Sequence, residues 1–254
     1  MIVFYTVVAP DWWPFQVVSI THKRLPPKRY SYYFLLVDNG MYSFVQRNER
    51  PNIDTWIARL RRFVYDLERT RRPNEIIVVL PDWLRDPEFT LSVTRKYSRI
   101  LCKDYKCMVV AHYNMKYSIS DVIMEALSIE GIEKIGIPCK LYCSRKGKNR
   151  RVPRYACMKT LIEIAYSVVR NRHRLHALGL GFNEKLLSSI RDKILSFDNT
   201  TWSRPFSAIP KKYSAKTKKE REEYFKAVLR KYSEYLYIPS FIPQDVFVEI
   251  LQGV

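Results

Sequence analysis

Short continuous runs of apolar residues, rich in β-branched and aromatic side chains, recur along the whole chain and predict eight strands. The runs are continuous rather than alternating, which is typical of strands that are covered on both faces. The predicted strands span 2–8, 15–20, 32–37, 75–80, 107–111, 133–137, 174–178 and 194–197.

Helical periodicity fills the segments between these runs. Within 52–69, apolar residues recur at spacings of three and four and so form one face of a helix. Asp86 before Pro87 is typical of a helix start and predicts a helix over 87–101. The remaining predicted helices span 118–129, 157–171, 183–193, about 215–236 and about 243–251.

Strands that alternate with helices indicate βαβ units and a parallel sheet. Eight such strands in 254 residues predict an α/β fold, a (β/α)8 TIM-type barrel that forms a single domain over 1–254, with C-terminal helices from about 215. The segment between 2–8 and 15–20 is too short for a crossover helix. Either the first unit is abbreviated or 15–20 is not a barrel strand, and an open doubly wound sheet is the alternative architecture.

The chain is strongly basic: 44 Lys and Arg stand against 25 Asp and Glu, which gives a formal net charge of +19. This excess favours a polyanionic partner, nucleic acid first and an anionic membrane surface second. No apolar run is long enough to span a bilayer, and the N-terminus lacks the basic region of a secretory signal. We therefore expect no membrane partner and a cytoplasmic protein, in a host cytoplasm if a virus encodes it.

The five cysteines are Cys102, Cys107, Cys139, Cys143 and Cys157. An odd count without a signal peptide predicts reduced thiols, while a Cys139–Cys143 or Cys143–Cys157 disulfide is the alternative for a thermophilic source. The last three cysteines resemble part of a metal site. No histidine follows them at ligand spacing, so we expect no metal.

Three aspartates stand where predicted strands end: Asp38, Asp82 and Asp198. In a barrel, the carboxyl ends of the strands form the active-site face, so the three side chains are expected to share one mouth. Converging carboxylates repel one another, and catalysis is one reason for keeping them together. Taken singly, each could instead be a turn or capping residue.

Glycine is scarce, and four of the seven glycines lie in or just after predicted strand ends. Such placement indicates backbone that turns tightly or approaches a ligand closely. These four are Gly40, Gly136, Gly179 and Gly181.

Five short segments, in order over about 30–205, resemble the tRNA-guanine transglycosylase superfamily, including its branch that inserts 7-deazaguanines into DNA. The segments are VDNGMYSF (37–44), VVLPDWLRDPEFTL (78–91), IEKIGIP (132–138), LHALGLG (175–181) and FDNTTWSR (197–204). The family's DSGG stretch is here Asp38-Asn39-Gly40-Met41. Its zinc-binding cysteine cluster has no counterpart, since no cysteine follows Cys157. These departures favour the shorter DNA-modifying relatives, or a diverged protein, over the tRNA enzymes.

The resemblance implies a base exchange that needs no cofactor. Asp198 would attack C1′ of a guanosine nucleotide and form a covalent glycosyl-enzyme. Asp38 would protonate the departing guanine and then deprotonate the incoming 7-deazaguanine, the co-substrate. Asp82 would read the base edge, and the Gly136 backbone would contact it.

Other residues are weaker candidates for holding the base. His112 or Asn114 would add a hydrogen bond to the base or play a structural role. Tyr42 or Trp83 would stack on a flipped base or simply pack in the protein.

A cationic loop follows the predicted strand 133–137 and is the candidate for gripping phosphates, with a merely solvated loop as the alternative. Its basic residues are Arg145, Lys146, Lys148, Arg150, Arg151 and Arg154. Two further functions remain open: a nucleic-acid-binding barrel without catalysis, and a hydrolytic N-glycosylase. Small members of the superfamily often dimerise, so a homodimer is a further expectation.

Overall fold

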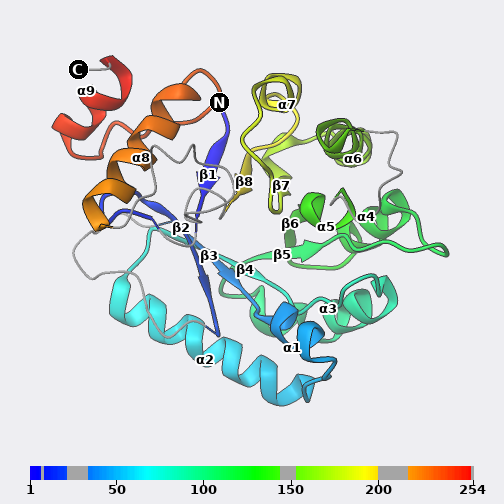
Figure 1. Cartoon of the computed structure of the whole chain (residues 1–254). Coiled ribbons are helices and arrows are strands. Elements are labelled where there is room, and N and C mark those ends of the chain that lie inside the picture. Colours follow the sequence, from blue (N-terminus) through cyan, green and yellow to red (C-terminus); the bar gives the residue numbers. More distant parts are fainter. Residues whose placement is uncertain (7–8, 22–33, 144–152, 200–216, 253–254) are drawn as a thin grey trace.

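Eight parallel strands form a nearly closed barrel in the computed structural model, which describes residues 1–6, 9–21, 34–143, 153–199 and 217–252 (Figure 1). The hydrogen-bonded order is β1-β8-β7-β6-β5-β4-β3-β2, and a single bridge between Thr6 and Gln16 joins β1 to β2. The strands are β1 Val3–Tyr5, β2 Phe15–Ser19, β3 Phe34–Asp38, β4 Glu75–Val79, β5 Lys106–Val110, β6 Ile132–Ile137, β7 Leu175–Ala177 and β8 Ser196–Asp198. All eight predicted strands and the TIM-type barrel are confirmed.

Helices surround the barrel (Figure 1). They are α1 Met41–Arg47, α2 Ile53–Arg71, α3 Pro87–Leu101, α4 Ile119–Leu127, α5 Cys139–Tyr142, α6 Arg154–Val169, the 3-10 helix Arg172–Arg174, α7 Glu184–Ile190, α8 Lys218–Lys231 and α9 Gln244–Gln252. The seven predicted helices are present with shifted ends. Helices α1, α5 and the 3-10 helix were not predicted, because they are too short to show periodicity.

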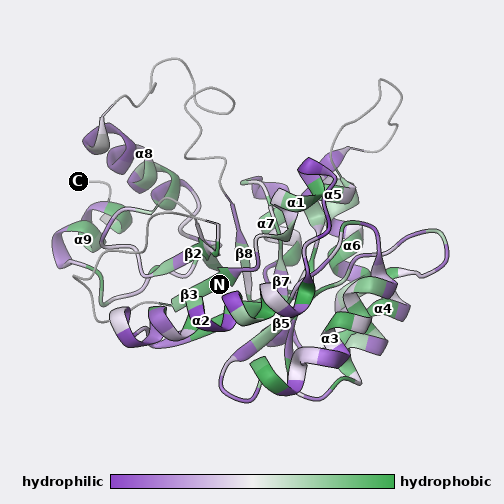
Figure 2. Ribbon diagram, turned by 90° about the horizontal axis from the view of Figure 1, so that it is seen from below, coloured by the Kyte–Doolittle hydropathy of each residue, from purple (hydrophilic) through white to green (hydrophobic). Residues whose placement is uncertain are grey.

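Local capping fixes where the long helices begin. The Asp86 side chain accepts a hydrogen bond of 3.0 Å from the Phe89 N–H at the start of α3, and Asn52 does the same for Thr55 in α2. The buried side of α2 includes Trp56, Leu60 and Val64, as its periodicity predicts. Figure 2 shows the same division, with hydrophilic residues on the outward faces of the helices and hydrophobic residues in the strands.

The first barrel unit is abbreviated: the predicted strand 15–20 is a barrel strand, β2, and the sheet is not an open doubly wound one. Residues 6–14 join β1 to β2 without a helix in their described part, and the Trp13 indole N–H donates to the Phe4 carbonyl at 3.1 Å. Helix α8 packs over this connection: the Phe225 ring lies 5.4 Å from the Trp13 ring, and Glu222 accepts from the Trp12 indole at 2.5 Å. A helix from distant sequence therefore shields the connection from solvent.

Two disulfides join four of the cysteines, so the expectation of reduced thiols is wrong. Cys102 at the end of α3 pairs with Cys107 in β5, and Cys143 pairs with Cys157 in α6. The Cα atoms are 5.4 Å and 5.7 Å apart, within the range that a disulfide spans. Spacing could not reveal the first pair, because the tight turn before β5 brings those residues together. Cys139 is free and buried.

Among the described segments, no helix is both long enough and apolar enough to cross a bilayer.

We predict that the unreduced protein, unfolded in denaturant, exposes one thiol to Ellman's reagent, that of Cys139. Before unfolding, this thiol reacts slowly because it is buried and burial raises its pKa. After reduction all five cysteines react. More than one reactive thiol in the unreduced, unfolded chain would contradict the pairing.

Candidate functional site

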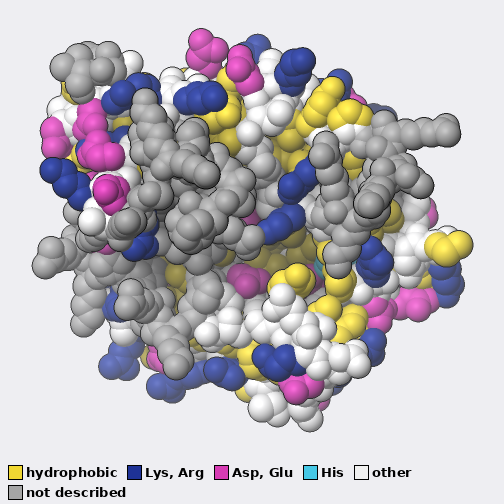
Figure 3. Space-filling model, in the orientation of Figure 1, with side chains coloured by type: hydrophobic (Ala, Val, Ile, Leu, Met, Phe, Trp, Pro, Cys, Tyr) yellow, Lys and Arg dark blue, Asp and Glu magenta, His cyan; other side chains and the backbone are white. Residues whose placement is uncertain are grey.

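The carboxyl ends of the strands bring the three predicted aspartates to one end of the barrel. Asp38 is the last residue of β3, Asp198 is the last residue of β8, and Asp82 lies just beyond β4. The carboxyl of Asp38 interacts electrostatically with those of both Asp82 and Asp198. Acidic side chains lie at the centre of this face, beside hydrophobic side chains (Figure 3).

Asp38 has a pKa of about 6, well above its usual 3.8. Burial is the largest cause, because it disfavours the charged form, and the neighbouring charge of Asp82 is the next. Hydrogen bonds from the Ser19 side chain and the Gly40 backbone act in the opposite direction. A carboxyl with this pKa both gives and takes a proton close to neutral pH, as a general acid and base must.

Asp198 is held by two donors on one of its oxygens. Its Oδ1 accepts from the Gly179 backbone N–H at 3.0 Å and from His176 Nε2 at 3.2 Å. His176 is buried in β7, and its Nδ1 lies 2.8 Å from the Ser196 hydroxyl. A carboxylate only accepts, so Nε2 carries the proton, and in the neutral ring Nδ1 accepts from Ser196. No described residue bonds Oδ2, which leaves this oxygen available to an electrophile.

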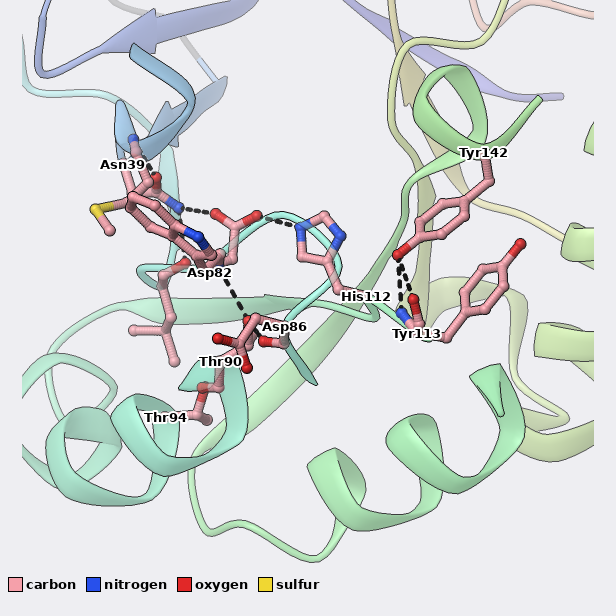
Figure 4. A network of polar contacts seen from close by, with 11 residues as sticks. Asn39, Asp82, Asp86, Thr90, Thr94, His112, Tyr113 and Tyr142 are labelled. Atoms are coloured by element: carbon pink, nitrogen blue, oxygen red, sulfur yellow. Dashed lines mark hydrogen bonds and ion pairs between the residues drawn. The ribbon is translucent and has the colours of Figure 1, made fainter. Parts of the chain in front are cut away.

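Asp82 sits in a polar network with Asn39 and His112 (Figure 4). The Asn39 amide donates to Asp82 Oδ1 at 2.7 Å and to the Leu80 carbonyl at 2.7 Å, and His112 Nε2 lies 2.5 Å from Asp82 Oδ2. A carboxylate has about four acceptor positions, so each oxygen can take one further donor. The network fixes the Asp82 carboxylate while keeping it able to accept from a ligand.

His112 contacts Asp82 directly, and its other ring nitrogen, Nδ1, is buried without a partner in the described structure. Next to it, Tyr113 and Tyr142 stack with ring centroids 3.9 Å apart. The Tyr142 hydroxyl donates to the Tyr113 carbonyl at 2.7 Å, and burial raises its pKa to about 12. These tyrosines are not candidates in the sequence analysis.

Two glycines at the mouth adopt left-handed backbone conformations. Gly40 has φ of 72°, and a Cβ there would lie 2.8 Å from methyl groups of Ile20 and Thr21. Gly179 has φ of 67°, and a Cβ would lie 2.6 Å from the Lys140 side chain. Only glycine fits at these positions, which hold the backbone beside Asp38 and Asp198.

The remaining glycine and aromatic residues that were candidates for contacting a ligand differ in how closely they are packed. A Cβ on Gly136 would lie 3.1 Å from Leu178, so this strand backbone is already closely packed, whereas one on Gly181 would meet nothing within 4 Å. Tyr42 is exposed on α1. Trp83 packs edge-on against Phe89, as in the alternative of simple packing.

Most of the predicted phosphate-gripping loop, Arg145 to Arg151, lies outside the described residues. Arg154 is described, exposed at the start of α6. Its charge acts on the thiol of Cys139, and so does that of Asp198. Arg154 and Asp198 are therefore both close enough to Cys139, just beyond β6, to act on its thiol. No cluster of metal-ligating side chains is present in the described segments.

Sequence reasoning missed His176, Ser196 and Asn39, all of them buried polar residues in or next to strands. The available signal was a polar side chain within a continuous apolar run, such as the histidine in LHALGLG. A buried polar group needs a hydrogen-bond partner: Asn39 bonds Asp82, His176 bonds Asp198, and Ser196 bonds His176.

No protein-family model matches the chain, and no curated protein matches it either.

We predict that Asp38→Asn stabilises the protein at neutral pH. The pKa of Asp38 is higher in the folded state than in the unfolded chain, so its protonated form contributes stability below about pH 4 that is lost as the pH rises through 6. The unfolding free energy of Asp38→Asn relative to the native protein should rise by about 1–3 kcal/mol between pH 4 and pH 7.5.

Urea unfolding of Asp38→Asn and of the native protein across this pH range measures the difference between their unfolding free energies. Asp192→Asn, which changes an exposed carboxylate, is the control and should show no such trend. A difference for Asp38→Asn that does not depend on pH would contradict the raised pKa.

Proposed function

We propose that this protein is a base-exchange transglycosylase that replaces guanine in nucleic acid with a 7-deazaguanine. The observation that carries the proposal is the pairing of two unlike carboxylates at one barrel mouth. Asp198 is oriented through Oδ1 with Oδ2 open, and Asp38 has a pKa of about 6. A carboxyl that exchanges a proton close to neutral pH, next to an oriented carboxylate with one oxygen open, is suited to the acid–base role while the other acts as nucleophile.

In the proposed reaction, Asp198 Oδ2 attacks C1′ of the target nucleotide. The C1′–N9 bond breaks, its electron pair goes to N9, and protonated Asp38 supplies the proton that the departing guanine needs. The covalent glycosyl-aspartate then meets the 7-deazaguanine. Asp38 takes the proton of its N9–H, N9 forms the new bond to C1′, and the Asp198 carboxylate is released. Asp38 ends protonated, ready for the next cycle.

The base would bind against the Asp82 network. The carboxylate of Asp82 can accept from the N1–H and the exocyclic amine of guanine, because Asn39 and His112 leave acceptor positions on both oxygens. A 7-deazaguanine presents the same donors, so one pocket can take both bases in turn. This is what an exchange requires.

Nucleic acid, with DNA favoured over tRNA, is the proposed polymer. The net charge of +19 supplies non-specific attraction, and Arg154 places one cation near Cys139, just beyond β6. The target nucleotide would have to leave its stack to reach the carboxylates.

We expect Asp198→Asn to abolish incorporation of radiolabelled guanine or 7-deazaguanine into DNA while leaving DNA binding intact. The amide is a far poorer nucleophile than the carboxylate, but it has almost the same size. Incorporation into DNA and tRNA is measured in parallel, with Asp192→Asn as the control that keeps activity.

If the native protein incorporates no radiolabelled base into either DNA or tRNA, the exchange proposal is wrong. Release of free guanine without incorporation would then identify a hydrolytic N-glycosylase, and binding alone would identify a barrel without catalysis.

We also predict that Arg154→Glu weakens DNA binding severalfold and makes its salt dependence shallower, because a phosphate contact is lost. Arg69→Glu on α2 makes the same change of charge on an exposed helix and is the matched control. Fluorescence anisotropy at several salt concentrations measures both slopes. Equal losses in the two variants would show a general effect of net charge and remove Arg154 from the interface.

A further inference from the structure

A cavity of about 210 Å³ lies at the amino ends of the strands, at the opposite end of the barrel from the three aspartates. Phe15, Phe34 and Glu75, the first residues of β2, β3 and β4, line it. Tyr237 and Phe241, from the segment between α8 and α9, are the exposed lining residues and form its rim. For comparison, an engineered cavity of about 150 Å³ accommodates benzene.

The cavity wall is largely aromatic. The Phe15 ring lies 5.1 Å from the Phe34 ring, 5.6 Å from the Tyr5 ring and 6.0 Å from the Tyr237 ring. Two of these contacts are edge-on, so ring faces and edges are both presented. Such a wall favours a flat ring system over a flexible chain, since aromatic pairs stabilise one another in offset or edge-on geometry.

The hydroxyl of Tyr5 is a polar group without a protein partner in this wall. Tyr5 is only 4% exposed, and no described residue forms a hydrogen bond with its hydroxyl. Burial raises the pKa of this hydroxyl, and the charge of Glu75 raises it further, so the hydroxyl stays protonated. The hydroxyl can therefore donate to an acceptor atom of a ligand in the cavity, which gains a hydrogen bond without displacing one within the described protein.

Glu75 offers the complementary group. Its Oε2 accepts from Lys106 Nζ at 2.5 Å, whereas Oε1 has no partner among the described residues. Because Lys106 neutralises the carboxylate, a cationic ligand gains little here. An uncharged N–H donor gains a hydrogen bond to a charged acceptor, which is stronger than one between neutral groups.

We propose that this cavity binds a small, planar, uncharged heteroaromatic molecule that carries an N–H donor next to a ring-nitrogen acceptor. The N–H donates to Glu75 Oε1, the Tyr5 hydroxyl donates to the ring nitrogen, and the aromatic wall contacts the ring. The site is separate from the proposed catalytic mouth and does not depend on the proposed function.

The test uses 7-azaindole, which has this donor–acceptor pair, and indene, a hydrocarbon of almost the same shape. Isothermal titration should show 7-azaindole bound at least about fivefold more tightly than indene, the factor expected for one hydrogen bond of about 1 kcal/mol. Tyr5→Phe should remove most of this preference. Tyr105→Phe, which removes a surface hydroxyl that bonds Glu68, should keep it.

Equal affinities for the two probes in the native protein, or no binding of 7-azaindole at 5 mM, would overturn the proposal. The comparison of 7-azaindole with indene in the native protein tests the proposal even if Tyr5→Phe fails to fold. Asp198→Asn should leave the binding of 7-azaindole unchanged; loss of binding in that variant would place the ligand at the mouth and overturn the assignment.

Discussion

Repulsion between partly buried carboxylates is the constraint on which the candidate site depends. Isolated acidic side chains would separate, but here parallel pairing fixes the strands that carry them. β3 pairs directly with β4, and β8 is connected to β3 through β1 and β2. Two features of the barrel reduce the cost of this repulsion. It raises the pKa of Asp38, so that one charge is lost close to neutral pH, and it supplies donors to Asp198 and Asp82. The different roles that we propose for the three residues rest on these different surroundings.

Asp82 and Asp198 are each accompanied by a polar partner that is itself deeply buried. Asn39 beside Asp82 is 1% exposed, and His176 beside Asp198 is 3% exposed. Both are anchored at their far side, Asn39 on the Leu80 carbonyl and His176 on Ser196. Anchoring restricts the rotamers of the carboxylates and holds them in one geometry before any ligand arrives, which is the arrangement that preorganised sites require.

The sequence determined the strands well because each is an uninterrupted apolar run covered on both faces, a pattern that loops do not share. Position at strand ends also placed Asp38, Asp82 and Asp198 at one mouth. The short helices α1 and α5 were not predicted, because a helix of fewer than two turns is too short for its apolar residues to show a helical spacing. The Cys102–Cys107 disulfide and the His176 contact also escaped, since both depend on which segments meet in space rather than on local pattern.

The pairing of the first strand has a consequence for how the chain folds during synthesis. Ile2 is hydrogen-bonded to the backbone of Tyr235 and Tyr237, and β1 pairs with β8, so β1 is completed by segments that are made much later than β1 itself. Until those segments leave the ribosome, the apolar run at 2–6 has no neighbour on that side and must remain unpaired. Contacts of such long sequence separation are slow to form, and a chaperone or an excess of charge along the nascent chain would reduce aggregation in the interval.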